Sequence, residues 1–86
     1  MESETLYFSG PLLLAARELA GYTQEQLAAR LVLAGVRKTT RKQSIAGWEG
    51  GIFVPGADVI PSLATILGVE VLSLFAPRVA KGLAKG

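Results

Sequence analysis

The sequence contains neither cysteine nor histidine, and each absence removes a class of function. Without cysteine there is no disulfide framework and no thiolate metal site. Without histidine the commonest general base, the usual imidazole metal ligand and the catalytic triad are all missing. The seven carboxylates are scattered along the chain and form no constellation that catalysis requires. We therefore expect no enzyme activity, no metal and no cofactor.

Long apolar runs are also lacking, although half of the 86 residues are hydrophobic. A membrane-spanning helix needs about 20 consecutive apolar residues, and no stretch approaches that length. The first ten residues have neither the basic start nor the long apolar centre of a signal peptide. The chain is therefore expected to be one globular, cytoplasmic domain with no membrane partner.

Acidic residues are absent between Gln26 and Trp48, in a chain whose net charge is only +2. The cations in that stretch are Arg30, Arg37, Lys38, Arg41 and Lys42. Several of them fall at the expected start of a short helix, where the positive end of the helix dipole disfavours cations. A polyanion would favour this arrangement, and the pattern therefore indicates a nucleic-acid partner.

Two helix starts are indicated by a threonine followed three residues later by a glutamine, a spacing typical of the capping box. Thr23 and Gln26 would begin one helix, which would end at Gly35. Thr40 and Gln43 would begin a second helix over about residues 41–49. A basic connection would join the two helices.

Three further helices are predicted from apolar spacing and from their start and stop residues. One begins near Pro11 behind a Ser9 or Gly10 cap, one follows an Asp58 cap, and a short one covers residues 69–75. The predicted fold is therefore all-α with five helices. The expected organisation is an N-terminal arm, a helical domain and a flexible tail: residues 1–10, 11–76 and 77–86.

Several apolar side chains exceed what a small core needs: Phe8, Leu12, Leu14, Phe53 and Val54. Exposed apolar patches on small domains usually mark interfaces. We expect a homodimer, and a different protein partner bound through the apolar arm or the loop at residues 52–54 stays open. Trp48 lies three residues after Ile45 on one helical face and is predicted to be core.

Four motifs follow one another along the chain and form a recognisable set. They are Arg17 four residues before Gly21, TQEQLA from Thr23, SIAGWEGG from Ser44, and P-x7-L-A-x2-L-G-V from Pro55. Together and in this order they resemble the Cro/repressor-type (XRE) helix-turn-helix family, over roughly residues 11–75. The resemblance implies a compact lambda-repressor-like domain of five helices, in which the second and third helices bind DNA.

The resemblance also implies roles for individual residues. Gln24 would hydrogen-bond a DNA phosphate from the start of the second helix. Arg17 and Glu49 would form a structural ion pair between the first and third helices. The groove-facing side of the third helix would present Arg41, Lys42, Gln43, Ser44 and, one turn later and without a side chain, Gly47.

Alternatives remain for several of these residues. In the major groove lysine suits guanine and glutamine suits adenine. Lys42 is otherwise a solvated charge, and Gln43 is otherwise occupied in its capping box. Gln24 either binds phosphate or only caps its helix. Arg37 and Lys38 lie in the connection, where phosphate contact and plain solubility are equally good interpretations.

The sequence departs from the family in two places. About seven extra residues, close to two helical turns, separate Leu31 from Thr40, which predicts a lengthened second helix followed by a loop back. Residues 52–54 are apolar where the family often has polar or basic residues. Phosphate contacts there would be limited to main-chain N–H groups.

The leading hypothesis is a sequence-specific DNA-binding transcriptional regulator, a repressor that reads the major groove of a palindromic operator with the helix at residues 41–49. Paired half-sites about one DNA turn apart suit a homodimer of this size. The alternative is a protein-interaction module, an antitoxin or an adaptor, built on the same helical scaffold.

Overall fold

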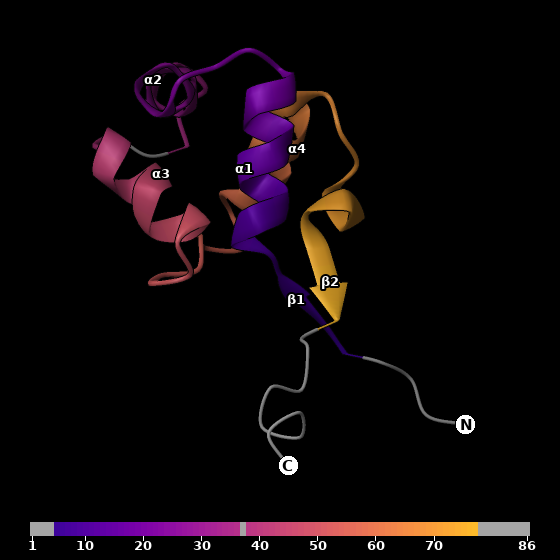
Figure 1. The fold of residues 1–86 in the computed structure, drawn as a ribbon. Coiled ribbons are helices and arrows are strands. Elements are labelled where there is room, and N and C mark those ends of the chain that lie inside the picture. The colour runs from indigo at the N-terminus through magenta and orange to yellow at the C-terminus, as the bar shows by residue number, and fades with distance from the viewer. Residues whose placement is uncertain (1–4, 37, 78–86) are drawn as a thin grey trace.

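The computed structural model describes residues 5–36 and 38–77 of the chain. In chain order its elements are β1 (Leu6–Phe8), α1 (Gly10–Leu19), α2 (Gln24–Leu33), α3 (Lys42–Glu49), α4 (Ile60–Leu67), the 3-10 helix η1 (Val71–Leu74) and β2 (Phe75–Pro77). Figure 1 shows α1 at the centre, with α3 on one side of it and β2 on the other. The described part is thus mostly helical, as expected.

The expected caps of α1 and α2 are present. The Leu12 N–H donates to the Ser9 hydroxyl at the start of α1, over 3.1 Å. At the start of α2 the Gln26 N–H donates to Thr23 Oγ1 and the Thr23 N–H donates to Gln26 Oε1, over 3.0 and 2.9 Å. This reciprocal pair is the capping box predicted from the threonine–glutamine spacing.

The capping box predicted for Thr40 and Gln43 is wrong. α3 begins at Lys42, and Arg41 rather than Thr40 occupies the cap position. The Arg41 N–H donates to the Ser44 hydroxyl over 3.4 Å, so Ser44 takes the role that had been expected of Gln43. The serine lies three residues after Arg41 and satisfies that N–H locally, which leaves the Gln43 amide out of the cap.

α2 ends where the sequence indicates, at Gly35. The Gly35 N–H donates to the Val32 carbonyl and the Val36 N–H to the Leu31 carbonyl, over 3.0 and 3.3 Å. This Schellman arrangement needs a left-handed residue, and Gly35 has a φ of 77°. The helix itself ends at Leu33, and residues 34–36 and 38–41 lie outside any helix, so the lengthening expected for this region does not extend beyond that point.

α4 starts two residues after Asp58, and Val59 rather than Asp58 occupies the cap position. The N–H groups of Val59 and Ile60 donate to the Gly56 carbonyl over 2.9 and 3.2 Å. Main-chain bonds therefore satisfy the helix start that a carboxylate cap had been expected to satisfy. Pro61 lies in the first turn, as predicted.

The short fifth helix expected at residues 69–75 is a 3-10 helix of four residues, and a small two-stranded sheet accompanies the helices. Residues 71–74 form the 3-10 helix η1, and Phe75 begins β2, which pairs antiparallel with β1 in the register Leu6↔Pro77, Tyr7↔Ala76, Phe8↔Phe75. The Phe8 and Phe75 rings meet edge to face at 5.9 Å, and the Ser9 N–H donates to the Leu74 carbonyl over 2.8 Å. Part of the expected N-terminal arm is therefore integrated into the domain.

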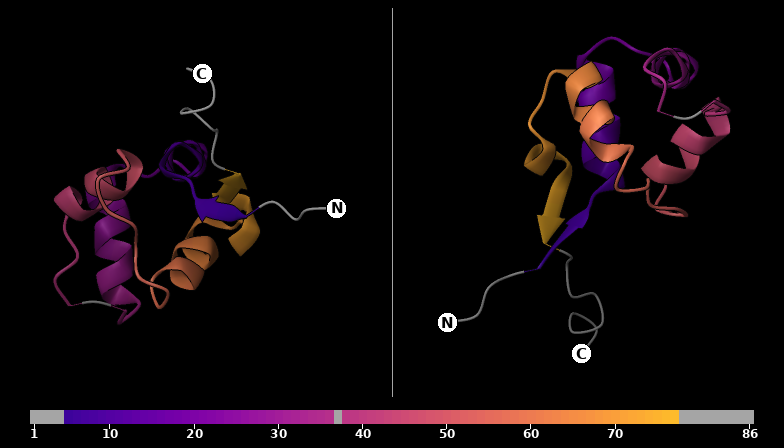
Figure 2. Two further views of the ribbon diagram at one scale, coloured as in Figure 1. Left: turned by 90° about the horizontal axis from the view of Figure 1, so that it is seen from below. Right: turned by 180° about the vertical axis from the view of Figure 1, so that it is seen from behind.

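The core lies between α1, α2, α3, α4 and η1. Its buried side chains are Leu13, Leu27, Ala28, Leu31, Ile45, Trp48, Val59, Leu63, Ala64, Leu67 and Leu74. Trp48 is core, as predicted. Burying each large aliphatic side chain contributes about 1.5–3 kcal/mol. In both views of Figure 2 the β1–β2 pair lies on the opposite side of α1 from α3. The core therefore holds α3 along one side of the molecule.

Within the described residues, no helix is long and apolar enough to cross a membrane.

Candidate nucleic-acid interface

The start of α3 and the connection before it present an unpartnered polar surface. Its exposed side chains are Lys38, Arg41, Lys42 and Gln43. None of these four side chains has a hydrogen bond or ion pair with any residue that the structure describes. On the opposite side of α3, Ile45 and Trp48 are buried in the core. The helix therefore separates an anchored apolar face from an outward basic face.

The charges at this helix start are unfavourable for the isolated protein. The first turn of α3 contains no acidic residue, and its N–H groups create a positive end. Arg41 and Lys42 add two cations to that end. A phosphate placed there would meet both the side-chain cations and the N–H groups of the helix start. The surface is thus suited to an anion. Arg37, the remaining cation predicted for this site, lies outside the described residues.

The other end of α3 is held by the predicted ion pair. Arg17 donates through Nε and Nη2 to the two carboxylate oxygens of Glu49, the second contact being 3.2 Å long. Arg17 Nη1 also donates to the Tyr22 carbonyl over 2.8 Å. Both charged side chains are about nine-tenths buried, with exposures of 10% and 7%. The hydrogen bond to Glu49 raises the pKa of the Arg17 guanidinium, so the charge is retained despite burial.

Gln24 belongs to this network. Its amide nitrogen donates to Glu49 Oε1 over 2.9 Å. An amide nitrogen carries two hydrogens, so one N–H of Gln24 remains for a phosphate. The phosphate contact predicted for Gln24 stays a prediction, and the structure adds that this side chain is oriented by the ion pair.

Close backbone packing also anchors α3. A Cβ added at Gly10 would lie 2.4 Å from the Glu49 carbonyl oxygen and 2.6 Å from that of Trp48. Only glycine allows the start of α1 to approach the end of α3 this closely. Sequence reasoning treated Gly10 only as a possible cap. It missed this contact because Trp48 and Glu49, the residues that Gly10 packs against, are far away along the chain.

Gly47 does not present a bare backbone, and the prediction for it is wrong. Gly47 is buried, and a Cβ built there would lie 2.7 Å from Cδ2 of Phe53. The ring of Phe53 therefore occupies the surface that had been expected to be open. The reason is local: the loop after α3 folds back so that Phe53 fills the gap left by the missing side chain.

The same fold-back removes two main-chain donors from the predicted phosphate contacts. The N–H groups of Ile52 and Phe53 both donate to the Gly47 carbonyl, over 2.9 and 3.2 Å. They close the C-terminal turn of α3 and are not available to a phosphate. Sequence reasoning named Phe53 only as a surplus apolar side chain of a possible protein interface, and it missed the contact of this ring with Gly47. The usable signal was a glycine inside a helix followed, after a glycine pair, by an exposed aromatic residue.

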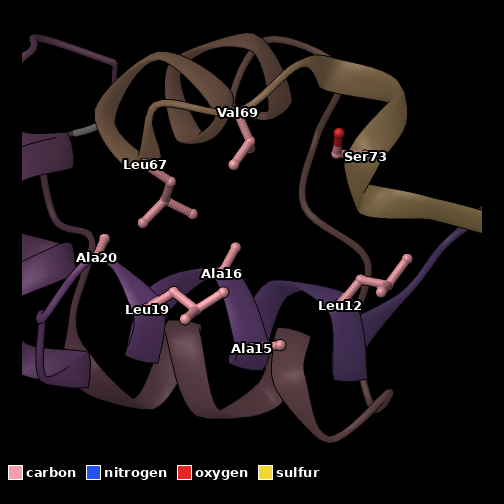
Figure 3. Close-up of a pocket in the computed structure, with 8 residues that line it drawn as sticks. All are labelled: Leu12, Ala15, Ala16, Leu19, Ala20, Leu67, Val69 and Ser73. Atoms are coloured by element: carbon pink, nitrogen blue, oxygen red, sulfur yellow. The ribbon is translucent and has the colours of Figure 1, made fainter.

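A second surface feature lies away from α3. It is a hollow of about 280 Å³, shown in Figure 3. Its lining residues are Leu12, Ala15, Ala16, Leu19, Ala20, Leu67, Val69 and Ser73. Nearly all are apolar, and Leu19 is 89% exposed. This hollow between α1, the end of α4 and η1 is suited to apolar contact and not to a charged ligand.

The described residues contain no group of histidine, cysteine, aspartate and glutamate side chains able to hold a metal ion. Comparison of the chain with protein-family models, curated proteins and solved structures finds no match.

Proposed function

We propose that the protein is a sequence-specific DNA-binding transcriptional regulator, a repressor of the Cro/repressor type with a lambda-repressor-like arrangement of its helices. The observation that carries the proposal is the basic, unpartnered start of α3 on a helix whose other end is tightly anchored. A rigid helix with cations and hydrogen-bonding side chains along its outer face suits the major groove.

The side chains divide into two roles. Lys38 and Arg41 contact phosphates. Such contacts position the domain on the duplex but carry no direct sequence information. Lys42 and Gln43 reach base edges, lysine toward guanine and glutamine toward adenine. The absence of the Gln43 side chain from the helix cap supports its role in readout. Ser44 is half-buried and accepts the Arg41 N–H, so its contribution is to hold the start of α3.

Selection of bound duplexes from a random DNA pool tests the proposal. If the chain acts as a homodimer, the selected site is palindromic, with half-sites about one DNA turn apart. Affinity for that site falls steeply with salt, with a log–log slope of about −0.9 for each phosphate neutralised. A slope near zero with every duplex tested contradicts the proposal.

Alanine at both Lys42 and Gln43 identifies the reading surface. This variant is expected to fold normally and to lose most of its preference for the selected site over random DNA. Arg30→Ala is the matched control, because Arg30 is an exposed cation on α2 that contacts the Tyr22 ring and lies outside the proposed surface. Equal losses in the two variants would indicate a general charge effect.

The alternative function is a protein-interaction module, an antitoxin or an adaptor. The apolar hollow beside α1 favours it, because exposed apolar surface of this kind is common at protein interfaces. The same hollow is also the surface through which a homodimer would form. Leu19→Asp places a charge in the hollow. Sedimentation of the wild type and of this variant distinguishes the two candidate functions. A dimer that becomes a monomer and loses operator affinity supports the first function, whereas a wild-type monomer that binds no DNA supports the alternative.

A further inference from the structure

We propose that Phe53 determines specificity by contacting the C5-methyl group of a thymine in the major groove. The inference rests on the DNA-binding function proposed above and names one chemical feature of the operator. It assigns a role to an exposed aromatic side chain that neither the core nor the ion-pair network uses.

The ring lies on the outward face of α3. Gln43 and Gly47 are four residues apart and therefore share one face of the helix. Ile45 and Trp48 are buried on the other side. The Phe53 ring covers Gly47, with Cδ2 only 2.7 Å from the position of an added Cβ. Phe53 thus takes the place of the missing side chain, one turn beyond Gln43.

The ring is held there by the main chain. The Phe53 N–H and the Ile52 N–H both donate to the Gly47 carbonyl. These bonds fix the loop against the last turn of α3 and position the ring before any partner arrives. Gly47 makes the arrangement possible because a larger residue would push the ring outward.

The chemistry of the surroundings favours DNA as the occupant. Phe53 remains 64% exposed although it is apolar. Arg41 and Lys42 lie at the start of the same helix, and their charge complements a polyanion. Within the major groove the thymine methyl group is the apolar feature of the base edges, and phenylalanine is among the side chains that contact it. A polar readout by Gln43 and an apolar readout by Phe53 would therefore address neighbouring base pairs.

The test replaces thymines of the selected duplex one at a time with deoxyuridine, which removes only the C5-methyl group. For the full chain, at least one replacement is expected to weaken binding about fourfold, the equivalent of ~0.8 kcal/mol for one buried methyl-sized group. Fluorescence anisotropy at constant salt measures the affinities.

Two variants link the effect to the ring. Phe53→Ala removes the ring. Gly47→Ala pushes the ring away and also places a better helix former in α3, so a loss of binding preference in this second variant does not come from a weakened fold. Both are expected to bind the thymine and deoxyuridine duplexes equally. Leu72→Ala is the matched control, because Leu72 is 66% exposed and lies on η1, away from α3. It is expected to retain the fourfold difference.

The outcomes separate this inference from the function on which it rests. If the chain binds its selected duplex but tolerates deoxyuridine at every thymine, the role of Phe53 is overturned and DNA binding stands. The same conclusion follows if Phe53→Ala retains the wild-type deoxyuridine profile. If no duplex is bound in a salt-dependent manner, both proposals fall, and a protein partner for the exposed loop becomes the better interpretation.

Discussion

The two ends of α3 differ in almost every physical respect. At the C-terminal end Glu49 is buried and accepts hydrogen bonds from Arg17 and Gln24, and Gly10 packs against its main chain. At the N-terminal end the side chains of Arg41 and Lys42 are exposed and have no partner among the described residues. The first end contributes to stability, whereas the second gains a favourable interaction only when an anion binds. This difference predicts which substitutions change folding and which change binding.

The largest effect is expected from breaking the anchored end at Arg17. Arg17→Ala leaves the Glu49 carboxylate buried without its charge partner, and such a change costs about 3–5 kcal/mol of unfolding free energy. Urea denaturation followed by circular dichroism measures the loss. The double variant Arg17→Met, Glu49→Leu is expected to recover most of it, because no buried charge is left. A loss below about 1 kcal/mol for Arg17→Ala would mean that water screens the pair.

A smaller loss is expected at Gly10. Gly10→Ala places a methyl group 2.4 Å from the Glu49 carbonyl oxygen, and the start of α1 must move away from α3. Overpacking of this kind costs about 1–3 kcal/mol. The midpoint of thermal unfolding should fall accordingly. Gly47→Ala, where only the exposed Phe53 ring must move, serves as the matched control and should be much less destabilising.

The two helix starts sharpen the comparison. Thr23→Ala removes a formed cap from α2 and should cost about 0.5–2 kcal/mol. Thr40→Ala removes no cap, because α3 begins one residue later, and should change stability by less than about 0.5 kcal/mol. Urea denaturation of both variants gives the comparison directly. Equal losses would contradict the assignment of the α3 start to Arg41 and Ser44.

These helix starts also illustrate what the sequence predicts well. The Thr23–Gln26 box and the glycine that ends α2 involve neighbours within a few residues, so the local pattern contains nearly all of the information. The Thr40–Gln43 box was wrong because Ser44 offers a competing hydroxyl one residue later. A choice between two local solutions depends on the rest of the fold and not on the spacing alone.

Non-local contacts account for most of the remaining differences. β1 and β2 have only three residues each, too few to show alternation, and each needs a partner at the far end of the chain. The contact between Phe53 and Gly47 depends on how a loop folds back, which no helical period encodes. The pairing of Arg17 with Glu49 followed from family resemblance, since no local pattern joins residues so far apart in sequence.

A small gain in stability, and the clearest separation of folding from binding, is expected at Lys42. Lys42→Glu places a carboxylate in the first turn of α3, where the helix dipole favours it by about 0.3–1 kcal/mol. The variant should therefore unfold at a slightly higher urea concentration than the wild type. Arg30→Glu is the matched control, because the same charge change in the last turn of α2 opposes the dipole and should lower stability.

DNA affinity should fall sharply in the Lys42 variant despite its greater stability. A lysine that weakens its own helix and yet is needed for binding would show that the start of α3 serves the partner, whereas unchanged affinity would assign Lys42 to solvent.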